Sequence, residues 1–210
     1  LPAQFWGNPM MDNLTTTETI IPAKKNQLII GILPGSREEA YANFAYITSI
    51  CETLVKQNNN IVFLCAWSPH LNLNNLSLHP HWVTSTNNSI TTLIHSPTNA
   101  TIIISPNFKA IINQAHLCIG LAGTANEQAL YLKKPVVCFE GFGPQSTLQR
   151  FGEQQQLMGK QLIICPNKSI ETICRTIQQT VASLKTTQPS SPSKNAAPFI
   201  ISDILNYLPS

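Results

Sequence analysis

Short, wholly apolar segments alternate with longer amphipathic ones through most of this chain, and this alternation limits the possible folds more than any other feature. Residues 27–33 (QLIIGIL) are apolar at nearly every position, as expected of a strand that is buried on both faces. Residues 38–57 follow with apolar side chains at helical spacing, and both patterns then recur. We expect strands at 27–33, 61–66, 82–84, 101–105, 116–120, 135–140 and 161–165, and helices at 38–57, 70–78, 107–115, 123–133, 145–158 and 169–184.

Strands that alternate with helices predict right-handed crossover connections, which place the strands parallel and the helices on both faces of the sheet. The expected fold is therefore α/β, with a Rossmann-like, doubly wound parallel sheet spanning residues 26–185. Residues 1–25 contain three prolines and a polar threonine run, which predict an interdomain arm or linker. Residues 186–210 predict a Pro- and Ser-rich linker followed by a short C-terminal helix.

The composition excludes several classes of partner. Only 11% of the residues are charged, and a net charge of +3 is too small and too dispersed to indicate nucleic-acid binding. No apolar run approaches the ~20 residues that a membrane-spanning helix needs. The six cysteines are spread without a C-x-x-C pair, which predicts reduced, structural thiols in a cytoplasmic protein. His79 and His81 have no Cys or carboxylate partner at ligand spacing, so we expect a solvated loop and no metal site there.

Ligands of doubly wound sheets bind beyond the carboxyl ends of the strands, so we expect a binding site at the turns that follow the predicted strands. The first turn reads L-P-G-S-R from Leu33 to Arg37. Gly35 allows a close backbone approach, Ser36 can cap the next helix, and Arg37 places a permanent cation at the ligand edge. We interpret this turn as a phosphate contact; the alternative is a tight turn whose arginine is only solvated.

A second turn, at residues 120–128, reads G-L-A-G-T-A-N-E-Q. Small residues at Gly123 and Thr124 open a helix there, and free backbone N–H groups in the field of a helix start can hold a diphosphate. Glu127 lies one turn further on, where its carboxylate can accept hydrogen bonds from two ribose hydroxyls. The alternative is a closely packed helix start in which Glu127 only complements the helix dipole.

A third turn, at residues 139–145, contains two glycines beside a proline and ends at Gln145. The amide of Gln145 can both donate to and accept from sugar hydroxyls; the alternative is an ordinary connection between a strand and a helix. The chain has no G-x-G-x-x-G fingerprint, no P-loop and no G-x-S-x-G turn. These absences argue against dinucleotide binding, P-loop nucleotide hydrolysis and α/β-hydrolase chemistry.

Taken together and in order, L-P-G-S-R, A-G-T-A-x-E-Q and G-x-G-P-Q resemble lipid-A-disaccharide synthase, and most closely the branch of lipid-A-disaccharide synthase-related proteins. The likeness covers most of residues 5–185, and residues 7–12 are similar to the stretch where that family crosses between its domains. The resemblance implies a GT-B glycosyltransferase. In that fold the C-terminal domain binds the UDP-sugar donor, and the N-terminal domain binds the acceptor and supplies the catalytic base.

The resemblance also implies roles for individual residues. Arg37 would stabilise the leaving group, and no catalytic base is expected within this chain. The implied contacts are the donor diphosphate for Gly35, Ser36, Arg37, Gly123 and Thr124, the ribose for Glu127, the donor sugar for Gln145 and Gln128, and uracil for the backbone of Ile104 and Ser105. The fold implies neither a metal nor another cofactor. In lipid A biosynthesis the acceptor is a lipid, which implies peripheral association of the full enzyme with the inner membrane face.

We therefore expect the donor-binding half of a hexosyltransferase that moves a sugar from a UDP-sugar to an acceptor hydroxyl, with the lipid or sugar acceptor held by an N-terminal domain absent from these 210 residues. Three alternatives stay open. One is an enzyme like the UDP-sugar 2-epimerases, another is a non-catalytic donor-binding subunit that needs a separate acceptor-domain partner, and the third is a binding module without activity.

Overall fold

A computed structural model describes residues 7–22, 24–87 and 90–184. The predicted C-terminal linker and helix at 186–210 and the first six residues of the predicted arm lie outside the described residues. The strands are β1 (Leu28–Leu33), β2 (Ile61–Ala66), β3 (Trp82–Asn87), β4 (Ile90–His95), β5 (Ala100–Ser105), β6 (Leu117–Gly120), β7 (Val136–Cys138) and β8 (Leu162–Ile164). The helices are α1 (Glu39–Gln57), α2 (Phe108–Gln114), α3 (Gly123–Tyr131), α4 (Leu148–Met158) and α5 (Ile170–Leu184).

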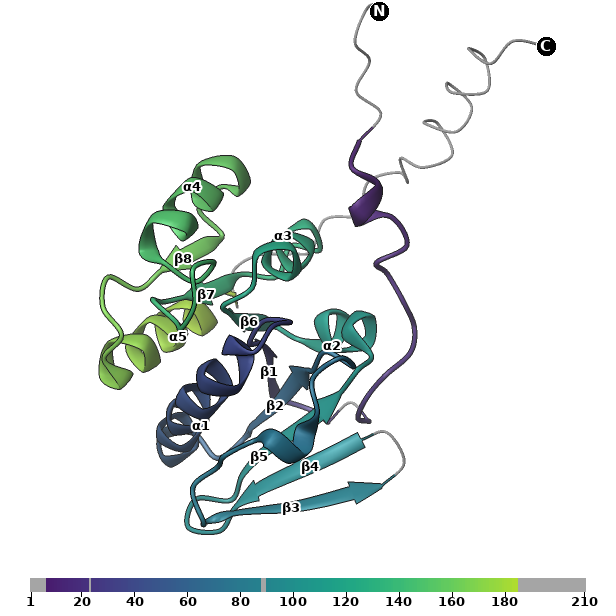
Figure 1. Ribbon diagram of the computed structural model, residues 1–210, viewed down its shortest axis with the longest axis vertical. Helices are drawn as coiled ribbons and strands as arrows, with labels where there is room; N and C mark the ends of the chain where they lie inside the picture. The colour runs from purple at the N-terminus through teal and green to yellow at the C-terminus, as the bar shows by residue number, and fades with distance from the viewer. Residues whose placement is uncertain (1–6, 23, 88–89, 185–210) are drawn as a thin grey trace, which may run out of the picture.

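All eight strands form one sheet in the order β3-β4-β5-β2-β1-β6-β7-β8 (Figure 1). The six strands from β5 to β8 are parallel, and β1 lies between β2 and β6, with Ile30 opposite both Phe63 and Leu117. Numbered along the chain, these six strands have the order 3-2-1-4-5-6 that defines the doubly wound Rossmann arrangement. The predicted fold class is confirmed, and the strand order reverses direction between β1 and β6.

The prediction was wrong at one edge of the sheet. Strand β4 was not predicted, and it runs antiparallel to both β3 and β5, so the sheet is mixed instead of wholly parallel. The predicted helix at 70–78 is replaced by a short 3-10 turn at Leu73–Asn75. The side chain of Asn72 accepts a hydrogen bond from the Asn74 amide at 3.0 Å, and such a local side-chain bond offers the backbone an alternative to a helix.

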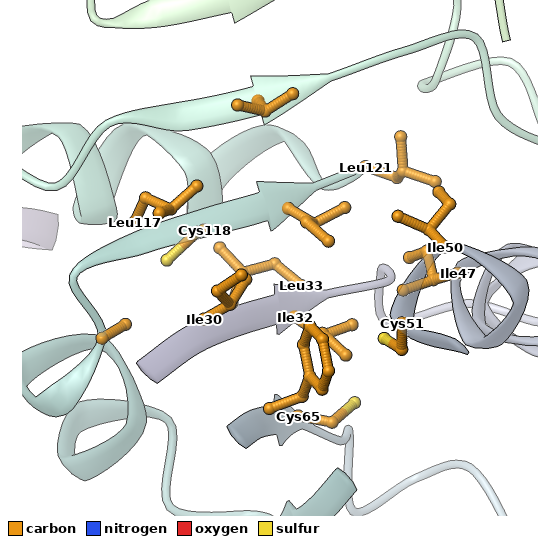
Figure 2. Close-up of a cluster of buried hydrophobic side chains, with 14 of the residues drawn as sticks. Ile30, Ile32, Leu33, Ile47, Ile50, Cys51, Cys65, Leu117, Cys118 and Leu121 are labelled. Atoms are coloured by element: carbon orange, nitrogen blue, oxygen red, sulfur yellow. The ribbon is translucent and has the colours of Figure 1, made fainter. Parts of the chain in front are cut away.

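Helices cover both faces of the sheet because successive residues of a buried strand point to opposite faces. Figure 2 shows Ile30 and Ile32 of β1 in the same buried cluster as Ile47 and Ile50 of α1. On the opposite face, Ile111 of α2 packs with Ile29, Val62 and Leu64. Helix α5 also packs against α1. The strands are thus apolar throughout because neither face of the central sheet meets water.

The N-terminal segment before β1 is bound to the surface of the domain. Figure 1 shows it in purple, running past α3 and α2 toward β1. The Asn113 amide donates to the Leu14 carbonyl at 2.7 Å, and Gln114 accepts a hydrogen bond from the Ile20 amide at 2.5 Å. Met11 and Leu14 are buried. Residues 8–21 of the predicted arm therefore follow the domain closely.

All six cysteines are free and buried, as the sequence predicts for structural thiols. Burial raises the pKa of every one of them, because a thiolate is poorly solvated in an apolar interior. Such thiols act as small apolar groups and are poor nucleophiles. Among the described residues, no helix is both long enough and apolar enough to cross a bilayer.

Candidate functional site

A cavity of about 540 Å³ lies beyond the carboxyl ends of the central parallel strands. Its lining includes residues 33–37 at the end of β1, 66–69 at the end of β2, 121–125 after β6, and Phe142, Gly143, Gln145 and Ser146 after β7, with Pro106 after β5 and further residues of α1, α2 and α3. The volume falls within the range of about 300–1,000 Å³ that is typical of small-molecule sites. Its place also matches the reversal of strand order, which is where doubly wound sheets bind their ligands.

The first predicted turn lines this cavity from Pro34 to Arg37. Gly35 has a φ of 114°, in the left-handed region that favours glycine. The prediction that Ser36 caps the helix was wrong, because α1 begins at Glu39 and its N-cap residue is Glu38, which makes no side-chain capping bond. Arg37 is exposed, and among the described residues its guanidinium forms no ion pair. Its charge is therefore available to a ligand.

The second turn brings the start of α3 to the same cavity. The Leu121 amide donates to the Leu33 carbonyl at 2.9 Å and so joins the end of β6 to the end of β1. Helix α3 begins at Gly123, after an N-cap residue, Ala122, that makes no side-chain capping bond. A Cβ added at Gly123 would meet no atom within 4 Å. Gly123 and the exposed Thr124 thus leave open space in front of a helix start, which attracts anions.

The third turn also contributes to the lining of this cavity, with Phe142 and Gln145. Helix α4 begins three residues later than Gln145, at Leu148, because the side chain of Thr147 caps it by accepting from the Arg150 amide at 3.2 Å. Gln145 therefore stands in an exposed loop. Arg37, Thr124 and Gln145, which were predicted from three separate turns, line one cavity.

Two predicted residues on α3 are engaged within the protein. Glu127 does not line the cavity, and its carboxylate accepts a hydrogen bond from Gln154 Nε2 at 3.2 Å. The same Nε2 donates to the Gly123 carbonyl at 2.9 Å. Gln128 does line the cavity, but its Nε2 donates to the Met10 carbonyl at 2.7 Å and so holds the N-terminal segment on α3.

Ile104 and Ser105 lie apart from this cavity, in an adjoining hollow of about 500 Å³. The two spaces share Trp67 and Pro106 among their lining residues. The Ser105 carbonyl already accepts from the Trp67 amide at 3.1 Å, and both residues are buried. The predicted uracil contact therefore lies beside the main cavity, in a continuation of it.

Sequence reasoning missed two polar residues that hold the turns together. Asn43 and Ser146 are 2% and 3% exposed, and both line the cavity. Asn43 lies on the apolar stripe of α1, between Ala40 and Ile47 at helical spacing. The sequence offered one signal for Asn43: its amide falls at a core-facing helix position, and a buried polar group needs hydrogen-bond partners.

Three of the five histidines, His79, His81 and His95, line a second cavity of about 330 Å³ beside the second half of α1. The rings of His79 and His81 lie 4.7 Å apart, and His95 Nε2 lies 3.6 Å from Glu52 Oε1. The two loop histidines are exposed, as predicted. Among the described residues, no three His, Cys, Asp or Glu side chains are arranged to hold a metal ion.

We expect His95 to make the fold less stable in acid. Burial lowers the pKa of His95, with further lowering from His81, His79 and Lys56, although Glu52 acts in the opposite direction. The unfolded chain therefore binds the proton more readily, and stability falls as the pH drops below the unfolded pKa of about 6.5. The urea midpoint should be lower at acid than at neutral pH. Replacing His95 with glutamine should reduce that difference, and an unchanged difference would contradict the assignment.

No protein-family model and no curated protein sequence matches this chain. Among solved structures it resembles the UDP-GlcNAc 2-epimerase from Neisseria meningitidis bound to UDP-GlcNAc, with a TM-score of 0.50 and 15% identity over 88% of this chain and 46% of that one. It also resembles a Listeria monocytogenes protein provisionally assigned as a UDP-N-acetylglucosamine 2-epimerase, with a TM-score of 0.54 and 14% identity over 94% of this chain and 50% of that one. This chain spans about half the length of each neighbour. Identities this low establish a shared fold alone.

Proposed function

We propose that this domain binds a UDP-sugar and is the donor-binding half of a glycosyltransferase similar to the lipid-A-disaccharide synthase-related proteins. One observation carries the proposal: three turns with phosphate- and sugar-binding chemistry line a single cavity at the switch point of the sheet. UDP-GlcNAc is the natural probe, because the Neisseria neighbour was solved with that ligand. The proposed reaction transfers the sugar to an acceptor hydroxyl.

The diphosphate would lie between Arg37 and the start of α3. An arginine fork matches phosphate oxygens, and the first N–H groups of a helix add donors in the positive field of its dipole. The open space at Gly123 lets an oxygen approach these donors. The same groups would stabilise UDP as it leaves, since charge develops on the departing phosphate during transfer.

The remaining parts of the donor follow from this placement. The sugar would face Gln145, and the uracil would extend into the adjoining hollow at Ile104 and Ser105. A ribose contact at Glu127 requires its carboxylate to turn from Gln154, and a sugar contact from Gln128 requires release of the Met10 carbonyl. Both residues therefore make their ligand contacts at the cost of a hydrogen bond within the protein.

Transfer needs a second domain in this proposal. Of the described residues that line the cavity, Arg37 and Glu39 are the charged ones, and Glu39 packs beneath Gly143. The acceptor site and the catalytic base would come from another Rossmann-like half, as the resemblance to the lipid-A-disaccharide synthase-related proteins implies, and both structural neighbours are about twice as long as this chain. A lipid acceptor would bring that complete enzyme to the inner membrane face.

Calorimetric titration of the purified chain with UDP, ADP and UDP-GlcNAc tests the proposal. We expect UDP and UDP-GlcNAc to bind at least about tenfold more tightly than ADP, a difference of about 1.4 kcal/mol. The affinity should persist in EDTA, because the proposed site holds phosphate with arginine and backbone donors. Equal binding of UDP and ADP, or no binding of either, would overturn the proposal and leave the fold assignment intact.

A further inference from the structure

We infer that Asn43 and Ser146 are positioning residues, which join the three turns into one frame and so fix Gln145 relative to Arg37. The inference rests on the proposed function only where a ligand is used to test it. Neither residue belongs to the motifs that suggested the site. Both are almost fully buried, and both make hydrogen bonds to turns far away in the chain.

Asn43 connects the first turn to the third. Its Nδ2 donates to the Pro34 carbonyl at 3.0 Å and lies 3.4 Å from the Phe142 carbonyl, to which it also donates. Its Oδ1 accepts a hydrogen bond from the Phe142 amide at 2.7 Å. One side chain on α1 thereby satisfies backbone groups of two turns that are about a hundred residues apart in the sequence. Leaving such buried groups without a partner costs about 1–3 kcal/mol each, so the arrangement is strongly specified.

Ser146 connects the third turn to the second. Its hydroxyl donates to the Leu121 carbonyl at 3.0 Å, directly before the start of α3. Its own carbonyl accepts from the Gly141 amide at 2.8 Å, and its amide donates to the Gly143 carbonyl at 3.2 Å. These bonds close the third turn on itself, so Ser146 links the whole turn to the residue that follows β6.

The packing of two glycines leaves the third turn little room to shift. A Cβ added at Gly141 would lie 2.8 Å from Asn43 Oδ1, and one at Gly143 would lie 2.6 Å from the Cγ of Glu39. Gly143 also has a φ of 93°, a backbone conformation that residues other than glycine rarely adopt. The turn therefore lies directly on the first turns of α1, and Asn43 sets its position there.

Amide hydrogen exchange of the ligand-free chain tests the frame without any ligand. The Phe142 N–H is the group that Asn43 holds, so in Asn43→Leu its exchange should quicken by at least about tenfold below the melting temperature. Ser146→Ala removes only the hydroxyl that ties the third turn to the Leu121 carbonyl. In the loosened turn the Gly141 N–H, which donates to the Ser146 carbonyl, should exchange faster. This second variant keeps the test valid if Asn43→Leu does not fold. Thr48→Val is the control, because Thr48 is buried on the same helix and its hydroxyl donates to the Ala45 carbonyl of that helix.

A double-mutant cycle with Gln145→Ala then tests positioning of the ligand contact. We expect Asn43→Leu to weaken UDP-GlcNAc binding about fivefold in the otherwise unchanged chain and less than about twofold when Gln145 is already alanine. If Asn43 only stabilises the fold, or if its loss loosens the whole domain, Asn43→Leu should weaken UDP-GlcNAc binding equally with Gln145 and with alanine at position 145. Thr48→Val should weaken binding in neither background.

The possible outcomes separate the two proposals. Unchanged exchange at Phe142 in Asn43→Leu, or equal losses of affinity with and without Gln145, would overturn the positioning role. If the unaltered chain binds neither UDP nor UDP-GlcNAc, the proposed function fails, and hydrogen exchange alone then decides whether the frame exists. Faster exchange at Phe142 together with coupling to Gln145 supports both.

Discussion

Replacing Arg37 with alanine is expected to weaken UDP binding by one to two orders of magnitude while the domain stays folded. A charge-assisted hydrogen bond is worth about 1.5–3 kcal/mol, which corresponds to roughly 10- to 100-fold in affinity. Arg37 is exposed, and among the described residues it forms no ion pair that the fold would lose. Calorimetric titration measures the affinity, and thermal denaturation checks the fold.

Two further variants show whether charge alone is responsible. Arg37→Lys keeps the charge but loses the planar fork, so it should restore only part of the affinity. Arg175→Ala removes an exposed arginine of α5, which does not line the cavity, and should leave UDP binding unchanged. If the Arg37 and Arg175 variants bind UDP equally well, the phosphate role of the first turn is refuted.

Two glycines of the second turn should respond in opposite ways to the same substitution. Gly120→Ala is expected to destabilise the fold by about 1–3 kcal/mol, the usual effect of overpacking a core. The new Cβ would lie 2.1 Å from Asn126 Oδ1 and 2.6 Å from a methyl carbon of Val136, and both of these side chains are completely buried. The substitution therefore forces at least one of them to move.

Gly123→Ala should instead leave stability within about 0.5 kcal/mol, because alanine favours a helix and the added methyl meets no atom within 4 Å. That methyl would occupy the space where we place a phosphate oxygen, so UDP affinity should fall about fivefold, or about 1 kcal/mol. Urea denaturation and calorimetric titration of the two variants check the contrast. Unchanged UDP affinity in a folded Gly123→Ala chain would place the diphosphate elsewhere.

The central part of the fold was predictable because strands that are buried on both faces have apolar residues at nearly every position. The strands around β1 are apolar at nearly every position, and α1 repeats apolar residues at helical spacing. Strand β4 carries only a one-sided pattern, with Thr91, Leu93 and His95 buried, inside a stretch rich in Asn, Ser and Thr. Two of those three side chains are polar, so the segment lacks the alternation of apolar and polar residues that predicts a strand.

The candidate site was predictable where local chemistry marks it and hidden where contacts are distant in sequence. Arg37, Thr124 and Gln145 stand at strand ends, so the rule for doubly wound sheets brings them to one edge. The hydrogen bond between Asn43 and Phe142 joins residues that are 99 positions apart, and no local sequence motif predicts it. The bond from Gln128 to Met10 spans 118 positions and is equally hidden.

The frame formed by Asn43 and Ser146 also bears on how the site would bind its ligand. Turns that are already fixed lose little conformational freedom when a ligand arrives, so more of the contact energy contributes to affinity. The hydrogen bonds of Glu127 and Gln128 act in the other direction, because they must be exchanged for bonds to the ligand. We therefore expect the diphosphate to dominate affinity and the ribose and sugar contacts to add specificity.

A crystal structure of this chain bound to UDP-GlcNAc tests the central claim most directly. The account predicts the diphosphate between the Arg37 guanidinium and the backbone N–H groups of Gly123 and Thr124, with the sugar on the side of Gln145. It is contradicted if the diphosphate and the sugar lie outside the 540 Å³ cavity, or if the diphosphate lies inside it but away from both Arg37 and the start of α3.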